Sequence, residues 1–464
     1  MGHRLEREPL ALRESQAAGG ETLRLRELFF LSFGGQAPLI SLLTFGTAML
    51  ALAGRAGSEA MLMATAIVAM NGLVVYFMSR RFKQGGGYYR YAYYSLTPNL
   101  GLNTGWTYLA YSLAYGGTLL SGGAYVMKVA LSLLGLAAPD WALAVIVSSA
   151  SAGLLLAGLK VSARYAELVA AAEAAIIVAL SLALLRASGW HLYNPVETPL
   201  RPYLFAAVVL GLGIPTGYGS IVPLGYDARS SDIGRAAVIV SLFGGLLAAA
   251  FFYSLGAAGF TGNLVEYLLH RFGAVGLVLI SVIALSDGAM GGIAYMLASS
   301  RTALAMSEDG LLPQVLSRRV RGRPLASEAF AASLFVATIT MMSKYLGLYL
   351  TFASLGSLAG LFNLFIHSSA DFSLIRVALR RAARHVHEVL TGAAAAAVSL
   401  YVLLYSLPAI NKYVAYIFMG WIILGFLYAE ALEMVGRPAG APQPGGPTGG
   451  RSMRLRAHRR RPRP

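Results

Sequence analysis

The chain contains no cysteine. This absence excludes disulfide bonds and thiolate metal sites, and it leaves the cellular compartment undecided. The zinc-binding spacing His-Glu-x-x-His is also missing, and the seven histidines fall mostly in expected loops and tails. We therefore expect no bound metal and no cofactor.

Charged residues are also scarce, and this decides the class of protein. Only 12% of the 464 residues are charged, 57% are hydrophobic, and the mean hydropathy is +0.62. A soluble protein covers its surface with about 25% charged residues. Because this chain has far fewer, most of its surface must face lipid.

Acidic residues are fewer than basic ones, 21 against 37, which gives a formal net charge of +16. Such an excess can indicate a nucleic-acid partner. Here the basic residues lie in short expected loops and in the two tails, where they determine membrane topology. We therefore expect no nucleic acid as a partner. The tail 1–26 also lacks the short apolar core and cleavage site of a signal peptide.

Twelve apolar stretches are long enough to be transmembrane helices. They cover 27–53, 58–79, 98–133, 138–158, 161–186, 203–228, 233–260, 273–300, 326–342, 346–376, 386–406 and 411–432. The sequence thus predicts an all-α integral membrane protein with twelve transmembrane helices.

Counting Lys and Arg residues predicts the orientation. With the N-terminus in the cytoplasm, 30 of them are cytoplasmic and 7 are external. The excess of cytoplasmic positive charge predicts that both termini are cytoplasmic in a multi-pass protein of the cytoplasmic membrane. The tail 436–464 is rich in Gly, Pro and Arg, and we expect it to be disordered. It either serves topology alone or binds anionic lipid headgroups.

Two of the apolar stretches contain residues that are poor at continuing a helix. "GLGIPTGYGS" (211–220) has four glycines and Pro215, and "FGGQAPLIS" (33–41) has two glycines and Pro38. At 1.5 Å per residue both lie near the middle of the bilayer. Irregular backbone survives there only where it faces protein or a wet cavity. Glycine clusters that merely let helices pack closely are the other interpretation.

The two interruptions are separated by five helices, so the helices that carry them cross the membrane in opposite directions. Paired interruptions in two halves are typical of inverted-repeat transporters. We expect repeats over 27–186 and 203–376 (a 5+5 inverted repeat with broken helices 1 and 6), with 386–432 as two additional helices. The free N–H and C=O groups of a broken helix attract an anion and a cation, and a zwitterionic amino acid carries both.

Four stretches resemble the amino acid–polyamine–organocation transporters, which have the leucine-transporter fold. "KQGGGYYRYAYYSLTPNLGLNTGW" (83–106) resembles the family's Gly-Gly-x-Tyr segment before a Gly-Trp, and "GYGSIVPLGYDARSSDIGRA" (217–236) resembles its Gly-aromatic run. "SSRTALAMSEDGLLP" (299–313) resembles its Ser-Arg…Asp-Gly-x-x-Pro motif, and the interruption in 33–41 occupies the expected place.

The resemblance implies that both interruptions contact the substrate. The implied residues are Gly34, Gly35, Gln36, Ala37, Gly213, Ile214, Pro215, Gly217 and Tyr218, the last as an aromatic gate. Family members often have an acidic residue after that aromatic, where this chain has Gly219. This difference favours a neutral amino acid over a cationic one.

Three tyrosines, Tyr108, Tyr111 and Tyr115, share one face of the expected helix 98–133. Such a stripe is typical of packing, but a hydroxyl at this depth, that of Tyr111, is also able to reach a substrate carboxylate. Both interpretations stay open.

Two acids, Glu173 and Asp287, fall at similar depths inside expected helices, with no Lys or Arg at that depth. An ionisable residue inside the membrane is a functional hypothesis. Removal from water disfavours the charged carboxylate, so each acid must be protonated, bind a cation or meet backbone donors. The resemblance implies a coupling-ion site here, to which Ser286 adds an oxygen. A simple hydrogen bond to a neighbouring hydroxyl or amide is the alternative.

Other polar residues have local interpretations. His367 and Asp371 are one helical turn apart, which predicts either a proton relay or a polar pair near Arg376. Glu167 is expected to pair with Arg164. A loop cluster is expected from Asp227, Arg229, Asp232 and Arg235.

The sequence therefore predicts a secondary transporter that takes up a small neutral amino acid with a proton as coupling ion, and no enzymatic activity. An exchanger, a polyamine carrier, a sodium-coupled carrier and a passive channel remain alternatives. A membrane enzyme or electron carrier would need paired haem-ligating histidines, and only His367 lies well inside an expected helix. The expected partners are the substrate, the coupling ion and membrane lipids.

Overall fold

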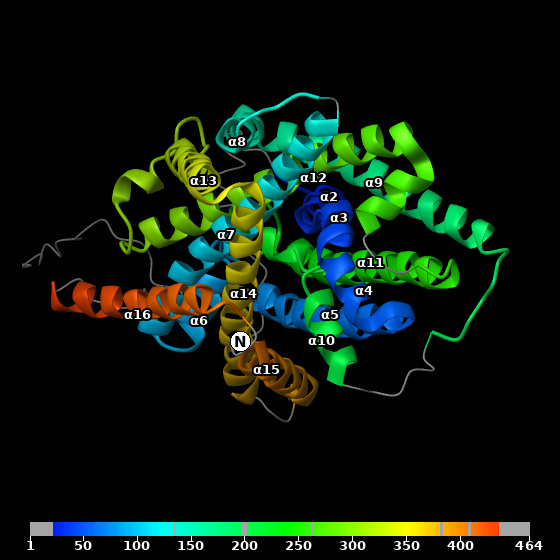
Figure 1. Cartoon of the computed structure of the whole chain (residues 1–464). Helices are drawn as coiled ribbons and strands as arrows, with labels where there is room; N and C mark the ends of the chain where they lie inside the picture. The colour runs from blue at the N-terminus through cyan, green and yellow to red at the C-terminus, as the bar shows by residue number, and fades with distance from the viewer. Residues whose placement is uncertain are drawn as a thin grey trace, which may run out of the picture.

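The structure is a computed structural model that describes residues 22–133, 135–195, 202–260, 264–380, 384–406 and 410–435. Within these residues the fold is all-α, apart from isolated β-bridges at Leu23–Ala228 and Val320–Arg323. Figure 1 shows α14 upright near the centre, α16 projecting to one side, and α9 and α11 on the other. The tail predicted for 436–464 lies outside the described residues, as does most of the segment 1–26.

The helices follow the apolar stretches of the sequence. Their bounds are α2 (Leu25–Gln36), α3 (Pro38–Ser41), α4 (Thr47–Ala53), α5 (Gly57–Arg81), α6 (Tyr88–Ser95), α7 (Pro98–Leu133), α8 (Asp140–Ala157), α9 (Leu159–Ala187), α10 (Pro202–Gly211), α11 (Ser230–Ala257), α12 (Leu264–Glu308), α13 (Leu325–Leu346), α14 (Leu348–Leu379), α15 (Val386–Ser406) and α16 (Lys412–Met434). A non-helical Gly273 kinks α12 near its start.

Ten segments of the described chain have the length and composition of membrane spans. The chain is therefore a multi-pass membrane protein. Each of the ten coincides with an expected span. The two expected spans that are not among them are 98–133 and 203–228.

The segment 98–133 forms one continuous helix, α7, of 36 residues. It contains polar side chains such as Asn103, Thr107 and Ser112, all of which are completely buried. Because α7 packs against α12, α14, α6 and α16, its polar residues face protein and not lipid. A hydropathy criterion misses such a helix. The segment 203–228 differs for another reason, since it is α-helical only over α10.

Small residues bring α7 and α12 close together. A methyl group added at Gly288 on α12 would lie 2.7 Å from the carbonyl oxygen of Leu119 on α7. Small residues at helix interfaces let backbones approach closely inside a membrane, where packing replaces the hydrophobic driving force. This contact places α12 directly beside the tyrosine stripe of α7.

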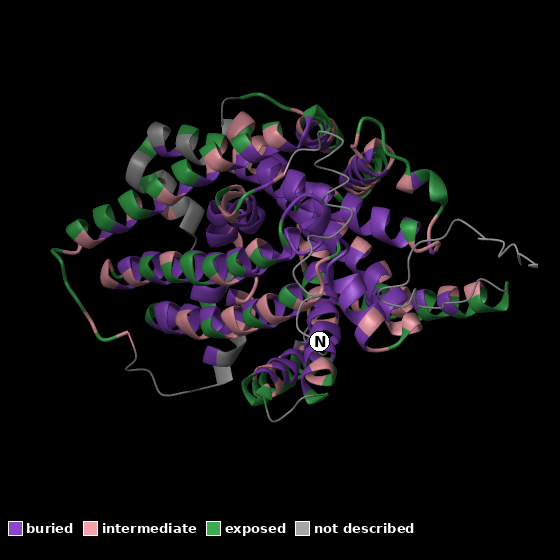
Figure 2. Cartoon of the chain, turned by 180° about the vertical axis from the view of Figure 1, so that it is seen from behind, coloured by how far each residue is buried: buried purple, intermediate pink, exposed green. Residues whose placement is uncertain are grey.

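The outer helices present apolar side chains to their surroundings. Leu168 on α9 is 73% exposed, and Leu404 on α15 and Tyr416 on α16 are almost as exposed. Figure 2 shows that buried residues concentrate in the middle of the molecule and exposed ones on the outer faces of the helices. An apolar exterior of this kind suits contact with lipid.

Candidate functional site

The first expected substrate-binding stretch lies where α2 gives way to α3. The α-helix stops at Gln36, Ala37 adopts a left-handed φ of 46°, and Pro38 begins the next helical segment. Proline has no N–H to continue the hydrogen-bond ladder, and a left-handed non-glycine residue costs roughly 1–2 kcal/mol. Gly34, Gly35 and the residues around them are buried, so this strained backbone lies inside the protein.

The second stretch follows α10, which ends at Gly211. Regular α-helix resumes only at Ser230, and two short 3₁₀ segments, Gly217–Ser220 and Leu224–Tyr226, lie between. Ile214 and Tyr218 in this stretch are buried. Irregular backbone buried in a membrane protein needs hydrogen-bond partners, and tyrosines supply part of them.

Two tyrosines of the stripe on α7 donate to backbone carbonyls of the second stretch. The Tyr108 hydroxyl lies 2.6 Å from the Gly219 oxygen, and the Tyr115 hydroxyl lies 2.8 Å from the Gly213 oxygen. The third tyrosine, Tyr111, lies with its hydroxyl 3.2 Å from that of Tyr295 on α12. The stripe therefore does more than pack, because its hydroxyl groups donate hydrogen bonds to carbonyl oxygens of the irregular backbone after α10.

The two stretches touch each other. Gln36 Nε2 donates to the Pro215 oxygen at 2.9 Å and to the Val240 oxygen at 3.2 Å. A methyl group at Gly217 would lie less than 3.0 Å from the Ser32 oxygen and from the Gln36 nitrogen. The residues that the sequence selected from 33–41 and from 211–220 thus form one buried centre.

Tyr218, the expected gate residue, is completely buried in this centre. Its hydroxyl lies 3.2 Å from Nε2 of His367 on α14. His367 therefore contacts the centre directly, which the sequence did not indicate. Asp371, one turn further on, accepts a hydrogen bond from Ser399 at 3.3 Å. Arg376 donates to the Leu96 oxygen at 3.0 Å. His367 and Asp371 form no direct hydrogen bond with each other, and both interpretations of the two residues stay predictions.

The two acids expected at similar depth lie together. The carboxyl groups of Glu173 and Asp287 are neighbours that interact electrostatically, and the two residues are 2% and 0% exposed. Asp287 Oδ2 also accepts from the Ile40 amide at 2.8 Å, just beyond the left-handed residue that ends α2. Among the described residues no N–H or O–H group donates to Glu173.

This geometry restricts the charge of the acid pair. Two neighbouring buried carboxylates disfavour each other's charge, so ionising both requires a cation beside them. The backbone amide stabilises charge on Asp287, whereas Glu173 has no such donor. A proton on Glu173 and a negative charge on Asp287 would satisfy both observations.

Ser286 lies beside the pair but its hydroxyl points elsewhere. Its Oγ donates to the Ile283 oxygen at 3.0 Å within the same helix, and its own carbonyl accepts from the Tyr165 hydroxyl at 3.2 Å. Tyr165 on α9 is thus a neighbour of the acid pair that the sequence did not single out.

A comparison with known families adds no assignment. No protein-family model matches this chain. No curated protein matches its sequence either. The geometry of the centre and of the acid pair therefore carries the functional argument.

A buried ion-pair network links the end of the second stretch to α12 and α13. Arg301, 2% exposed as a side chain, donates to Asp227 at 2.5 Å and to Glu328 at 2.9 Å, and Arg323 also pairs with Glu328 at 2.8 Å. Arg301 lies in the "SSR" motif of the sequence, but its partners were not predicted. Of the expected loop cluster, Asp232 pairs with Arg235 at 3.8 Å, whereas Asp227 pairs with Arg301.

A second ionic cluster lies beside this network. Arg90 on α6 is 3.4 Å from both Glu308 and Asp309, and Glu308 also accepts from Tyr226. Burial and the nearby charge of Asp309 raise the pKa of Tyr93 to about 12, so that this hydroxyl stays neutral. Arg319 also pairs with Glu308 at 3.0 Å, so the charge of the cluster is set by the two arginines and the two acids.

One expected ion pair is wrong. Glu167 on α9 pairs with Arg26 on α2, 141 residues away in the sequence, and not with Arg164. A spacing of three residues on a helix permits an ion pair, but the packing of α2 against α9 brings a different arginine to the acid.

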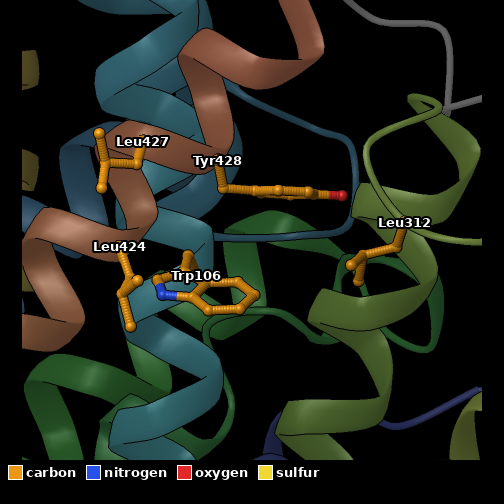
Figure 3. Close-up of a pocket in the computed structure, with 5 residues that line it drawn as sticks. All are labelled: Trp106, Leu312, Leu424, Leu427 and Tyr428. Carbon is orange, nitrogen blue, oxygen red and sulfur yellow. The ribbon is translucent and has the colours of Figure 1, made fainter.

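An apolar groove of 540 Å³ lies apart from the centre, between α7, α16 and the loop after α12. Trp106, Leu312, Leu424, Leu427 and Tyr428 line it (Figure 3). None of these residues belongs to the interrupted stretches or to the acid pair. The groove opens among apolar outer helices, and we assign it no part in the site.

Proposed function

We propose that the chain is a secondary active amino acid transporter of the cytoplasmic membrane. In this proposal it belongs with the amino acid–polyamine–organocation transporters that it resembles, and it has their 5+5 inverted repeat. Residues 27–186 and 203–376 form the repeats, 386–432 form the two additional helices, and both termini are cytoplasmic. It catalyses no chemical change in the substrate.

One observation carries the proposal. Two helix interruptions from distant parts of the chain meet in a buried centre, joined by the bond from Gln36 to the Pro215 oxygen. Interrupted helices inside a membrane place free amides and carbonyls where they bind charged groups of a substrate. The substrate carboxylate would bind at Gly34, Gly35, Gln36 and Ala37. The ammonium would bind the carbonyls of Gly213, Ile214 and Pro215.

The surroundings of Tyr218 favour a neutral side chain on the substrate. A methyl group at the next residue, Gly219, would already lie 2.9 Å from the Tyr111 hydroxyl. An acidic side chain at this position would therefore displace Tyr111. A cationic substrate would find no counter-charge here, while a small neutral one needs none. Gly217, Tyr218 and Tyr111 would then contact the substrate side chain.

The acid pair is the proposed coupling site. Asp287 bonds to the Ile40 amide just beyond the interruption of α2, so a change in the charge of the pair acts directly on the backbone that binds substrate. A proton that enters the pair in one orientation and leaves in the other would drive accumulation. A sodium ion between the two carboxylates is the alternative that the same geometry allows.

The network around Arg301 is the proposed inner gate. It ties Asp227, at the end of the second stretch, to α12 and α13. Alternating access moves one group of helices against the other, and this movement requires the network to open. The buried state of the centre fits an occluded conformation.

The test uses purified protein in liposomes and a panel of labelled amino acids and polyamines. Uptake is measured with an inward proton gradient, with a sodium gradient and with neither. Proton-driven accumulation of a neutral amino acid supports the proposal. Uptake only into liposomes preloaded with amino acid identifies an exchanger, and flux that no gradient drives and that does not saturate identifies a channel. If folded protein moves no amino acid or polyamine, the proposal is refuted.

A further inference from the structure

A second group of buried ionisable side chains lies beside Tyr218. His367 and Asp371 on α14 are 1% and 0% exposed, and Tyr88 at the start of α6 is 1% exposed. The Tyr88 ring packs edge-on against the His367 imidazole, with centroids 5.4 Å apart. The transport cycle proposed above makes no use of this group.

Each of these three residues has a buried polar atom without a partner. The atoms are His367 Nδ1, Asp371 Oδ1 and the Tyr88 hydroxyl oxygen, and no described residue hydrogen-bonds to them. Native proteins pair nearly all of their buried polar atoms with protein or water. Residues four apart on a helix also share a face, so His367 and Asp371 lie on the same face of α14.

We propose that Tyr218, His367 and Asp371 form a proton relay. In this relay the Tyr218 hydroxyl donates to His367 Nε2, and His367 Nδ1–H donates to a water molecule that donates in turn to Asp371 Oδ1. The 3.2 Å contact between Tyr218 and Nε2 supplies the first step. The unpartnered Nδ1 and Oδ1 atoms define the second.

The relay couples the position of Tyr218 to a proton. When Tyr218 swings away from His367, Nε2 loses its donor and takes up one proton from a hydronium ion that reaches the centre from solvent, and water is left behind. The imidazolium that forms faces the Asp371 carboxylate, which balances its charge. When Tyr218 returns, Nε2 gives this proton to a water molecule, which carries it away as hydronium, and the hydrogen bond from the hydroxyl forms again. No other bond is made or broken.

Few other ionisable groups influence this relay. Tyr88 on α6 faces the imidazole, and Tyr108 on α7 packs on Tyr88 with centroids 5.7 Å apart. On α15, Asp371 contacts the neutral Ser399. Glu388 on α15 is itself paired with Arg81 on α5.

The first test measures the tautomer of His367 directly, by ¹⁵N-histidine NMR of the full protein in detergent. Comparison with His367→Gln assigns its signal among the seven histidines. We expect the tautomer protonated at Nδ1. We also expect that Asp371→Asn shifts the Nδ1 signal, whereas Ser399→Ala at the other side of the acid shifts it much less.

The relay is wrong if His367 is protonated at Nε2 in the unaltered protein, or if Asp371→Asn leaves its signals unchanged. The signals of the other histidines report whether the variant is folded. Tyr218→Phe gives an independent check, because it must shift the Nε2 signal. An unshifted Nε2 signal in folded Tyr218→Phe contradicts the first step.

The role of the relay in transport rests on the proposed function, and a second readout keeps the two questions apart. In liposomes His367→Gln keeps a hydrogen-bonding group beside Tyr218 but does not titrate, so a purely structural role predicts an unchanged pH profile of uptake. The relay predicts a changed profile. If the NMR result supports the relay and no substrate is transported, the proposed function fails and the relay stands.

Discussion

Replacement of Gly217 by alanine is the most direct test of the centre. A methyl group at this position would lie less than 3.0 Å from the Ser32 oxygen and from the Gln36 nitrogen. Both of these atoms belong to the backbone of α2, so no side-chain rotation relieves the clash. Comfortable contacts need about 3.5 Å or more, and the two stretches must therefore separate by at least about 0.5 Å.

The size of the effect follows from two contributions. Overpacking a well-packed interior costs about 1–3 kcal/mol. Separation also weakens the bond from Gln36 to the Pro215 oxygen, and an unsatisfied buried polar group costs about 1–3 kcal/mol. We expect Gly217→Ala to lower the free energy of unfolding by about 2–5 kcal/mol.

The assay is thermal unfolding of the purified protein in detergent, with Gly360→Ala as the matched control. Gly360 lies inside α14, and a methyl group there would meet nothing within 4 Å. The control should be neutral or slightly more stable, because alanine favours a helix over glycine. If Gly217→Ala melts at the same temperature as the control and transports normally, the two stretches do not approach as closely as the structure indicates.

Three further predictions concern the acid pair, the inner network and the tyrosine stripe. Glu173→Gln should abolish proton-driven accumulation in liposomes but keep exchange, because glutamine has the shape of glutamate but no titratable proton. Asp287→Asn should have the same effect on accumulation, and it should also weaken the hydrogen bond from the Ile40 amide. Arg301→Met should destabilise the protein by about 3–5 kcal/mol in thermal unfolding, because it removes the partner of Asp227 and leaves Glu328 with Arg323 alone. Simultaneous replacement of Asp227 by asparagine should recover most of the loss. Tyr115→Phe should lower the free energy of unfolding by about 1–3 kcal/mol, because it leaves the Gly213 oxygen without a hydrogen-bond donor. An unchanged melting temperature would mean that another donor reaches this oxygen.

The sequence predicted the helices better than the contacts between them. Hydropathy located ten spans, and the rise per residue predicted that Glu173 and Asp287 lie at similar depth, which fits the proximity of their carboxyl groups. Each of these predictions depends on one segment at a time. Hydropathy is a weaker guide to α7, because a helix surrounded by protein need not be apolar.

The partners of side chains could not be predicted in the same way. Gln36 bonds to the Pro215 oxygen 179 residues away, and Glu167 pairs with Arg26 and not with its neighbour on the helix. Such choices depend on which helices pack together and at what rotation. Local spacing carries no information about either, so Arg301 and His367 entered the site only with the structure.

The hydroxyl groups that cover the second stretch have a consequence for the proposed transport cycle. Tyr108 and Tyr115 donate to the carbonyls of Gly219 and Gly213. Under the proposed function, a substrate ammonium would take the place of the Tyr115 hydroxyl at Gly213, so this oxygen would have a donor with and without substrate. A carrier of the proposed kind could then return across the membrane without cargo, which net uptake requires and obligatory exchange does not.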